Sequence, residues 1–110
     1  MSIQEKIKSD IAANDIILYM KGNAELPMCG FSARAVNLLK SCGAKFATVD
    51  VLQDEEVRQG IKVYSNWPTI PQLYVKGEFI GGSDIIAEMH ATGELQAIIK
   101  KVSEGHHAIR

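Results

Sequence analysis

Of the two cysteines in the sequence, Cys29 stands where a thiol could do chemistry. It lies in the segment Pro27-Met28-Cys29-Gly30-Phe31-Ser32, between an apolar run typical of a strand and a segment typical of a helix. The first N–H groups of a helix are unpaired and its dipole is positive there, so a thiolate is favoured over a thiol. Ser32 occupies the position that the second thiol has in a Cys-x-x-Cys motif. The segment therefore predicts one reactive thiolate without a second thiol beside it.

The second cysteine, Cys42, lies at the far end of the same predicted helix. If residues 30–42 are helical, a rise of about 1.5 Å per residue separates the two cysteines by roughly 20 Å. A disulfide needs Cα atoms within about 7 Å of each other. We therefore expect no disulfide within the chain, a reducing compartment, and a core or half-buried position for Cys42.

Two further segments carry groups that could serve Cys29. Lys21 directly follows the apolar run. It fits equally well a solvated loop lysine and a cation that lowers the pKa of Cys29 or holds an acidic ligand. Thr69-Ile70-Pro71 precedes another predicted strand. A cis bond before Pro71 would leave the N–H and C=O of the preceding residue free to pair with an extended peptide. The plain alternative is a loop that enters an edge strand.

The segment Gly81-Gly82-Ser83-Asp84 is a helix start that could also bind a ligand. Its plain interpretation is an N-cap. Free N–H groups there would also bind a carboxylate, and Asp84 could pair with an amine, as the amino-acid end of a small peptide requires. Arg58 and Lys62, one helical turn apart, are usually solvated charges, but would bind a second carboxylate if their face points toward Cys29. The three histidines show no metal-ligand spacing with the cysteines.

Hydrophobic periodicity predicts the elements that must position these residues. A first helix over 2–13 has an apolar stripe and a capping box made by Ser2 and Glu5. The elements predicted after it are a strand over 16–20, a helix over 30–41, a strand over 45–51, a helix over 54–64, hairpin strands over 72–75 and 78–80, helices over 84–91 and 94–103, and a polar tail over 104–110.

This order predicts an α/β protein with the thioredoxin fold. A parallel βαβ half and an antiparallel hairpin half form a four-stranded mixed sheet with helices on both faces. The 110 residues suit a single domain over 1–110. A net charge of -1 gives no basic footprint for nucleic acid or an anionic membrane. No apolar run approaches the length of about 20 residues that is needed to span a bilayer, and the N-terminus lacks a targeting pattern. We therefore expect a cytoplasmic protein, or an already processed form.

Four motifs taken together closely resemble the monothiol glutaredoxins of the Cys-Gly-Phe-Ser type. They are Lys21, Cys29-Gly30-Phe31-Ser32, Trp67-Pro68-Thr69-Ile70-Pro71-Gln72 and Gly81-Gly82-Ser83-Asp84. The resemblance runs from the first helix to about Val102 and fits the single-domain members. It implies glutathione as the bound tripeptide.

The resemblance implies a role for each candidate residue. Cys29 would be the active thiolate and a metal ligand. Lys21 and Arg58 would hold the glycine carboxylate of glutathione, with Lys62 as a candidate helper.

The same resemblance assigns the other end of glutathione. Ile70, beside a cis Pro71, would pair main chain to main chain with the cysteinyl unit. Ser83 and Asp84 would take the γ-glutamyl end. Many relatives carry Cys at the position of Ser83, so a role for a second thiol there is excluded in this chain. Many also carry Phe at the position of Ile70, which should leave the backbone pairing intact.

The resemblance further implies a 2Fe–2S cluster. Such a cluster needs four ligands, usually thiolates. One chain offers one well-placed thiolate, so two chains and two glutathione molecules would complete the set. The implied protein is a cluster-bridged homodimer that delivers its cluster to iron–sulfur recipient apoproteins and acts in iron homeostasis, with a BolA-like protein as a further partner.

Two other functions compete with this one. A glutathione-dependent thiol–disulfide oxidoreductase would remove glutathione from mixed disulfides. Because Ser32 replaces the resolving thiol, such an enzyme would need a second glutathione to regenerate Cys29. A redox-inert binding module of the same fold has no positive sign in the sequence.

Overall fold

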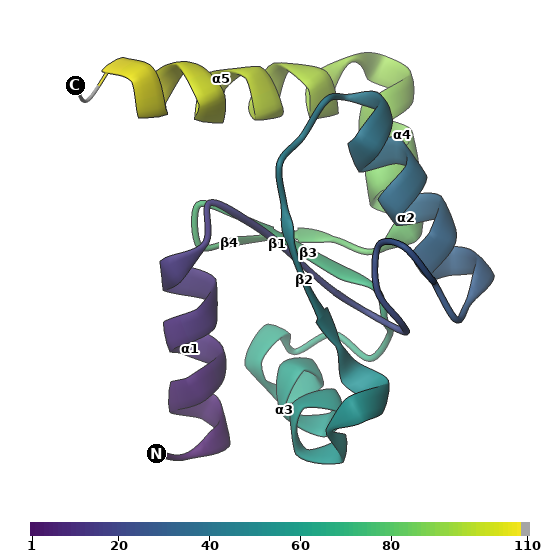
Figure 1. The fold of residues 1–110 in the computed structure, drawn as a ribbon, viewed down its shortest axis with the longest axis vertical. Coiled ribbons are helices and arrows are strands. Elements are labelled where there is room, and N and C mark those ends of the chain that lie inside the picture. Colours follow the sequence, from purple (N-terminus) through teal and green to yellow (C-terminus); the bar gives the residue numbers. More distant parts are fainter. Residues whose placement is uncertain (109–110) are drawn as a thin grey trace.

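The computed structural model describes residues 1–108 (Figure 1). In chain order its elements are α1 (Ile3–Ala13), β1 (Ile16–Met20), α2 (Gly30–Ser41), β2 (Ala47–Asp50), the 3-10 helix η1 (Val51–Gln53), α3 (Glu55–Ser65), β3 (Gln72–Val75), β4 (Glu78–Gly81), α4 (Ser83–Thr92) and α5 (Glu94–Ala108).

The four strands form one mixed sheet in the order β2-β1-β3-β4. β1 pairs parallel with β2 and antiparallel with β3, and β3 pairs antiparallel with β4. This is the four-stranded mixed sheet that was predicted for the thioredoxin fold, and the prediction is confirmed.

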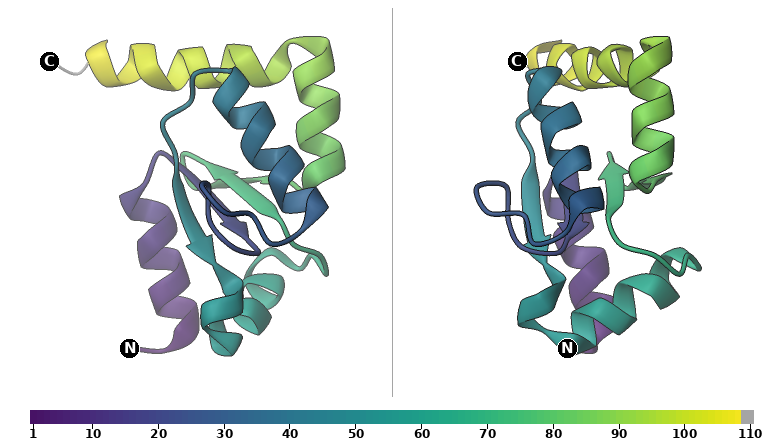
Figure 2. Two further views of the ribbon diagram at one scale, coloured as in Figure 1. Left: turned by 45° about the vertical axis from the view of Figure 1, so that its right-hand side comes forward. Right: turned by 90° about the vertical axis from the view of Figure 1, so that its right-hand side faces the viewer.

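The sheet is covered by helices on both faces. α1 and α3 lie on one face, and α2, α4 and α5 lie on the other (Figures 1 and 2). β1 is buried along its whole length, and its side chains alternate between the two cores because successive side chains of a strand point to opposite faces. Ile16, Leu18 and Met20 enter the core under α2, whereas Ile17 and Tyr19 enter the core under α1 and α3. This double burial explains why the strand carries no polar residue.

The start of α1 confirms the predicted capping box. The Glu5 N–H donates to Ser2 Oγ at 3.2 Å, and the Ser2 N–H donates to Glu5 Oε1 at 2.9 Å. Further along, α1 packs closely on α3 at Gly60. A Cβ at that glycine would lie 3.0 Å from Cδ1 of Ile7, and the Gly60 carbonyl accepts from Gln4 Nε2 at 2.9 Å. The close approach of the two helices therefore requires a residue that is otherwise unfavourable inside a helix.

Several predicted boundaries are wrong. β2 begins at Ala47 and ends at Asp50, because Val51 turns into η1. α4 begins at Ser83, so Gly82 is its N-cap. α5 continues to Ala108 through most of the predicted polar tail, since adding residues to an existing helix costs little and no proline stops it. The end of that tail, residues 109–110, lies outside the described residues. Within residues 1–108, no helix combines the length and the apolar character needed to cross a membrane.

Candidate functional site

Cys29 is the N-cap of α2 and has an extended backbone with φ -157° and ψ 140°. Its carbonyl accepts the first helical hydrogen bond, from the Ala33 N–H at 2.9 Å, and its thiol is half-buried. The pKa of the Cys29 thiol is lowered chiefly by the backbone N–H of Ser32. The N–H of Phe31, the ammonium of Lys21 and the Ser32 hydroxyl lower it further, while burial acts in the opposite direction. The helix start thus favours a thiolate, as the sequence predicts.

Ser32 is fully buried, although it stands where a second active thiol would be. Its Oγ accepts a hydrogen bond from the Lys21 N–H at 3.1 Å. The serine therefore connects the residue that follows β1 to the first turn of α2. It fixes the segment Cys29–Ser32, called the thiol turn below, relative to the sheet.

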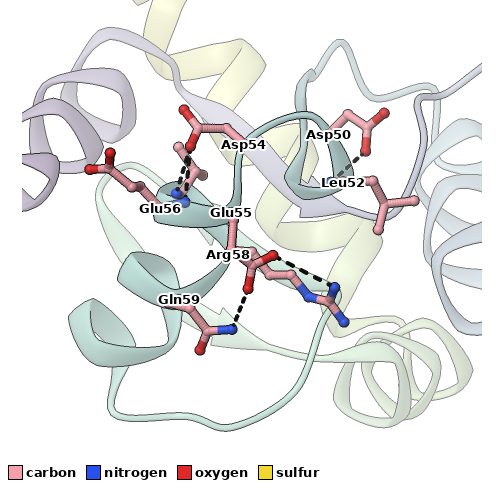
Figure 3. A network of polar contacts seen from close by, with 8 residues as sticks. Asp50, Leu52, Asp54, Glu55, Glu56, Arg58 and Gln59 are labelled. Atoms are coloured by element: carbon pink, nitrogen blue, oxygen red, sulfur yellow. Dashed lines mark hydrogen bonds and ion pairs between the residues drawn. The ribbon is translucent and has the colours of Figure 1, made fainter.

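The loop between β1 and Cys29 closes on itself. Gly22 forms an isolated bridge with Pro27, and the Met28 N–H donates to the Lys21 carbonyl at 2.9 Å. Asp50, at the end of β2, holds this loop from the other side: its Oδ1 accepts from the Gly22 N–H at 2.9 Å and from the Leu52 N–H at 2.9 Å. The Asp50–Leu52 contact is drawn in Figure 3. The sequence analysis missed Asp50, whose contact with Gly22 spans 28 positions of the chain.

A pocket of about 410 Å³ lies next to the thiol turn. It is lined by six of the residues expected to bind glutathione or to help, namely Lys21, Arg58, Lys62, Ile70, Ser83 and Asp84. Cys29 is not among the lining residues, but its neighbour Phe31 is. The structure therefore brings the predicted binding residues together in one pocket, which Phe31 of the same helix start also lines.

The cations Arg58 and Lys62 of α3 line this pocket together with Phe31, which lies two residues after Cys29. Arg58 Nη1 lies 4.0 Å from Glu55 Oε2, and Glu55 Oε1 accepts from Gln59 Nε2 at 2.8 Å (Figure 3). Arg58 Nε is buried and has no partner among the described residues. With Lys21 and Lys62 also lining the pocket, three positive side chains are available to an anionic ligand at this end.

The α4 end of the pocket offers different groups. Ser83 is buried, and its Oγ has no hydrogen-bond partner among the described residues. The Asp84 side chain is 94% exposed, and its Oδ1 lies 3.7 Å from Nη1 of Arg34 on α2. The sequence analysis missed this exposed ion pair, which places a cation beside the carboxylate expected to receive an amine.

The wall between these two ends is the segment that joins α3 to β3. Its Ile70–Pro71 peptide bond is cis, as predicted. In the described part of the chain, neither the N–H nor the C=O of Ile70 makes a hydrogen bond, so both remain available. Trp67, Pro68 and Thr69 also line the pocket. The sequence analysis assigned these three residues no role, although a tryptophan that stays 42% exposed is a signal for a binding surface.

The remaining candidates lie apart from this pocket. Cys42 is a free, half-buried thiol at the C-terminus of α2, as predicted. His90 Nε2 lies 3.1 Å from Ser41 Oγ at the end of α2, and His90 does not line the pocket. Within the described residues, no group of three or more His, Cys, Asp or Glu side chains could hold a metal ion.

Comparisons with known proteins agree on one family. Residues 16–80 match the glutaredoxin family. The chain is 54% identical over 99 residues to glutaredoxin 4 of Escherichia coli strain K12, and the aligned region covers 90% of this chain and 86% of the relative. It is 50% identical over 106 residues to glutaredoxin 4 of Haemophilus influenzae, and this alignment covers 96% of this chain and 99% of the relative. The solution structure of reduced poplar apo GrxS14 superposes with a TM-score of 0.80 at 44% sequence identity, and the superposition covers 92% of this chain and 93% of that structure.

The motif at the start of α2 refines this match. Cys29 is followed three positions later by Ser32, so the site has one thiol where a dithiol glutaredoxin has two. The relatives of nearly equal length also match this chain almost from end to end. The chain therefore belongs to the glutaredoxin family, as a monothiol-type member related to the single-domain glutaredoxin 4 proteins.

Proposed function

We propose that this chain binds glutathione in the pocket beside Cys29 and, together with a second copy, carries a 2Fe–2S cluster for delivery to other proteins. The observation that supports the proposal best is the arrangement of charge along the pocket. Lys21, Arg58 and Lys62 supply cations to the pocket, and the N-terminus of α4 lines it with Ser83 and Asp84.

This arrangement fits the charges of glutathione. The glycine carboxylate would pair with the cations of α3 and Lys21, and the Arg58 Nε, which has no protein partner, would gain an acceptor. The carboxylate of the γ-glutamyl unit would meet the free N–H groups at the start of α4, and its amine would meet Asp84. The unpaired backbone groups of Ile70 would bind the middle of the tripeptide. The Nε of Arg58 and the backbone groups of Ile70, which have no partner among the described residues, would then have one.

The cluster is cargo in this proposal. The chain offers Cys29 as a half-exposed thiolate at a helix start, and Cys42 lies at the opposite end of α2, about 20 Å away along the helix. Four ligands therefore require two chains, each with one bound glutathione. Since half of the ligands are small and exchangeable, such a cluster is suited to transfer into iron–sulfur recipient apoproteins, and hence to a part in iron homeostasis. A BolA-like protein could replace one chain of the homodimer.

Anaerobic reconstitution tests the proposal. The chain is mixed with iron, sulfide and glutathione, and its visible spectrum and molecular mass are recorded. We expect a coloured dimer that fails to form with Cys29→Ser or without glutathione, and that forms normally with the control Cys42→Ser. Loss of the cluster in Cys42→Ser, or a coloured monomer, would overturn the ligand assignment. A reducing cytoplasmic compartment belongs to the proposal, because Cys29 must stay reduced to act.

The lowered pKa of Cys29 favours a second candidate, a glutathione-dependent thiol–disulfide oxidoreductase. The Cys29 thiolate would attack the glutathionyl sulfur of a mixed disulfide, and the target protein would leave as a thiolate. A second glutathione thiolate would then attack the sulfur bound to Cys29, releasing oxidised glutathione and the free thiolate. Fast turnover of a glutathionylated peptide by a chain that assembles no cluster would favour this enzyme over the carrier.

A further inference from the structure

We propose that Gln72 is a positioning residue of the pocket, which holds the Trp67–Pro71 segment in the geometry that binds glutathione. Gln72 is the first residue of β3, faces Tyr19 of β1 in the sheet register, and is completely buried. It does not line the pocket. The inference rests on the proposed binding of glutathione, since the segment in question is the wall to which the tripeptide would pair.

The side-chain amide of Gln72 reaches the backbone of this wall at two points. Its Nε2 donates to the carbonyl of Trp67 at 3.2 Å and to the carbonyl of Thr69 at 3.1 Å. Both amide protons are thus used, and they clamp the wall at two residues that precede the cis bond at Pro71. Carbonyl oxygens only accept hydrogen bonds, so the two contacts also fix which end of the amide points toward the wall.

The wall has few other internal supports. Residues 67–71 form no helix or strand. Pro68 and Pro71 have no N–H to donate, and the backbone of the segment is anchored at its start by the Trp67 N–H, which donates to the Lys62 carbonyl at 3.1 Å. A single buried side chain therefore replaces the hydrogen bonds that a regular element would supply, and it does so next to the free backbone groups of Ile70.

Tyr74 supplies a matched control because it contacts the other end of the same amide. Its hydroxyl donates to Gln72 Oε1 at 3.0 Å. Burial raises the pKa of Tyr74 to about 12, so the hydroxyl is a neutral donor at physiological pH. Tyr74→Phe removes this buried hydrogen bond but leaves both bonds to the wall. It also keeps the ring that packs on Phe79, which in turn contacts Trp67.

The test compares Gln72→Met with Tyr74→Phe in the full chain. Glutathione affinity is measured by calorimetry, stability by urea unfolding, and the state of the wall by the emission of Trp67, the one tryptophan of the sequence. We expect both variants to lose stability. Gln72→Met should also weaken the affinity for glutathione about tenfold and shift the Trp67 emission, because two donors to the wall are lost. Tyr74→Phe should keep the affinity within about twofold and the emission unchanged.

A third variant keeps the test decisive if Gln72→Met does not fold. Gln72→Glu preserves the acceptor for Tyr74 and, when its buried carboxyl is protonated, one donor to the wall, so its affinity should lie between those of the parent and of Gln72→Met. Parental affinity and emission in either folded Gln72 variant would overturn the inference while leaving the proposed function in place. Absence of glutathione binding by the parent chain would overturn both.

Discussion

The hydroxyl of Ser32 accepts a hydrogen bond from the backbone N–H of Lys21 at 3.1 Å. The two residues are 11 positions apart: Ser32 lies in the first turn of α2, and Lys21 directly follows β1. Ser32 is completely buried, so its hydroxyl cannot act as a surface group. In this monothiol glutaredoxin, the residue at the position of the second thiol fastens the remaining thiol turn to the sheet.

Replacement of this serine should cost stability. Ser32→Ala leaves the Lys21 N–H without its acceptor in a partly buried place, and we expect the free energy of unfolding to fall by about 1–2 kcal/mol. The pKa of Cys29 should rise only slightly, because the Ser32 backbone N–H, which lowers it most, remains. Urea unfolding measures the first effect. The control is Ser41→Ala, whose exposed hydroxyl contacts Leu38 and His90; an equal loss there would contradict a special role for Ser32.

The ionisation of Cys29 should make stability depend on pH. Its thiol pKa is lower in the folded than in the unfolded chain, so forming the thiolate favours the folded state. The gain is complete above the unfolded pKa and is lost as the pH falls through the folded pKa. We therefore expect the parent chain to gain stability relative to Cys29→Ser as the pH rises across this window.

Two measurements check that expectation. Urea unfolding at a series of pH values gives the difference between the parent and Cys29→Ser. The pH dependence of thiol alkylation, with Cys29→Ser as the blank for Cys42, gives the folded pKa directly. A stability difference that stays constant with pH would refute the linkage, and so would an alkylation midpoint at or above the value of an unfolded cysteine.

Gly22 should be irreplaceable in the loop before the thiol turn. Its φ is +87°, and a Cβ would lie 2.4 Å from the Leu26 carbonyl oxygen and 2.7 Å from the Met28 nitrogen. Both neighbours are backbone atoms, so Gly22→Ala should cost at least about 2 kcal/mol. Gly30→Ala is the control, since its Cβ would meet nothing within 4 Å and its residue begins α2. A Gly22→Ala variant as stable as Gly30→Ala would contradict the loop geometry.

Most of the fold could be predicted because local signals and burial agree along the chain. β1 is an unbroken apolar run because both of its faces are buried, and the Ser2–Glu5 box marks the start of α1 within four residues. The end of α5 could not be predicted in the same way, because the segment from Glu104 to Ala108 is polar and includes Gly105, a residue type that often ends a helix, and yet the helix continues through it.

The site residues could be predicted where the residue type alone indicates the chemistry. They could not be predicted where the role of a residue depends on a neighbour that is distant in the sequence. A cysteine at a strand-to-helix turn is informative alone. The sequence left open whether Arg58 points toward Cys29, and only the packing of α3 shows that it lines the same pocket as Phe31. Gln72 and Asp50 act through backbone groups of other segments, and the partners of such contacts cannot be read from periodicity.

The charge balance around Arg58 should tune the affinity for glutathione. Arg58→Gln removes a cation whose Nε has no protein acceptor, and should weaken binding about five- to tenfold. Glu55→Gln removes the carboxylate that lies 4.0 Å from Arg58 (Figure 3), and should strengthen binding by less than about twofold, because both side chains are partly solvated. Calorimetry on both variants tests the signs of the two effects. Lys76→Gln is a control of equal charge change on the β3–β4 turn, and an equal loss there would point to net charge alone.

Replacement of Ser83 should stabilise the free chain and weaken its binding of glutathione. Its buried hydroxyl has no partner among the described residues, so Ser83→Ala should raise the free energy of unfolding of the free chain by about 0.5–1 kcal/mol. The same change should weaken glutathione binding about three- to tenfold, because the ligand would lose a donor at the α4 end of the pocket. Ser65→Ala is the matched control. Its hydroxyl already donates to the Ile61 carbonyl at 2.9 Å, so it should lose stability and keep its affinity. If Ser83→Ala instead loses stability and binds normally, the hydroxyl serves the fold of the free chain and the pocket does not hold its ligand there.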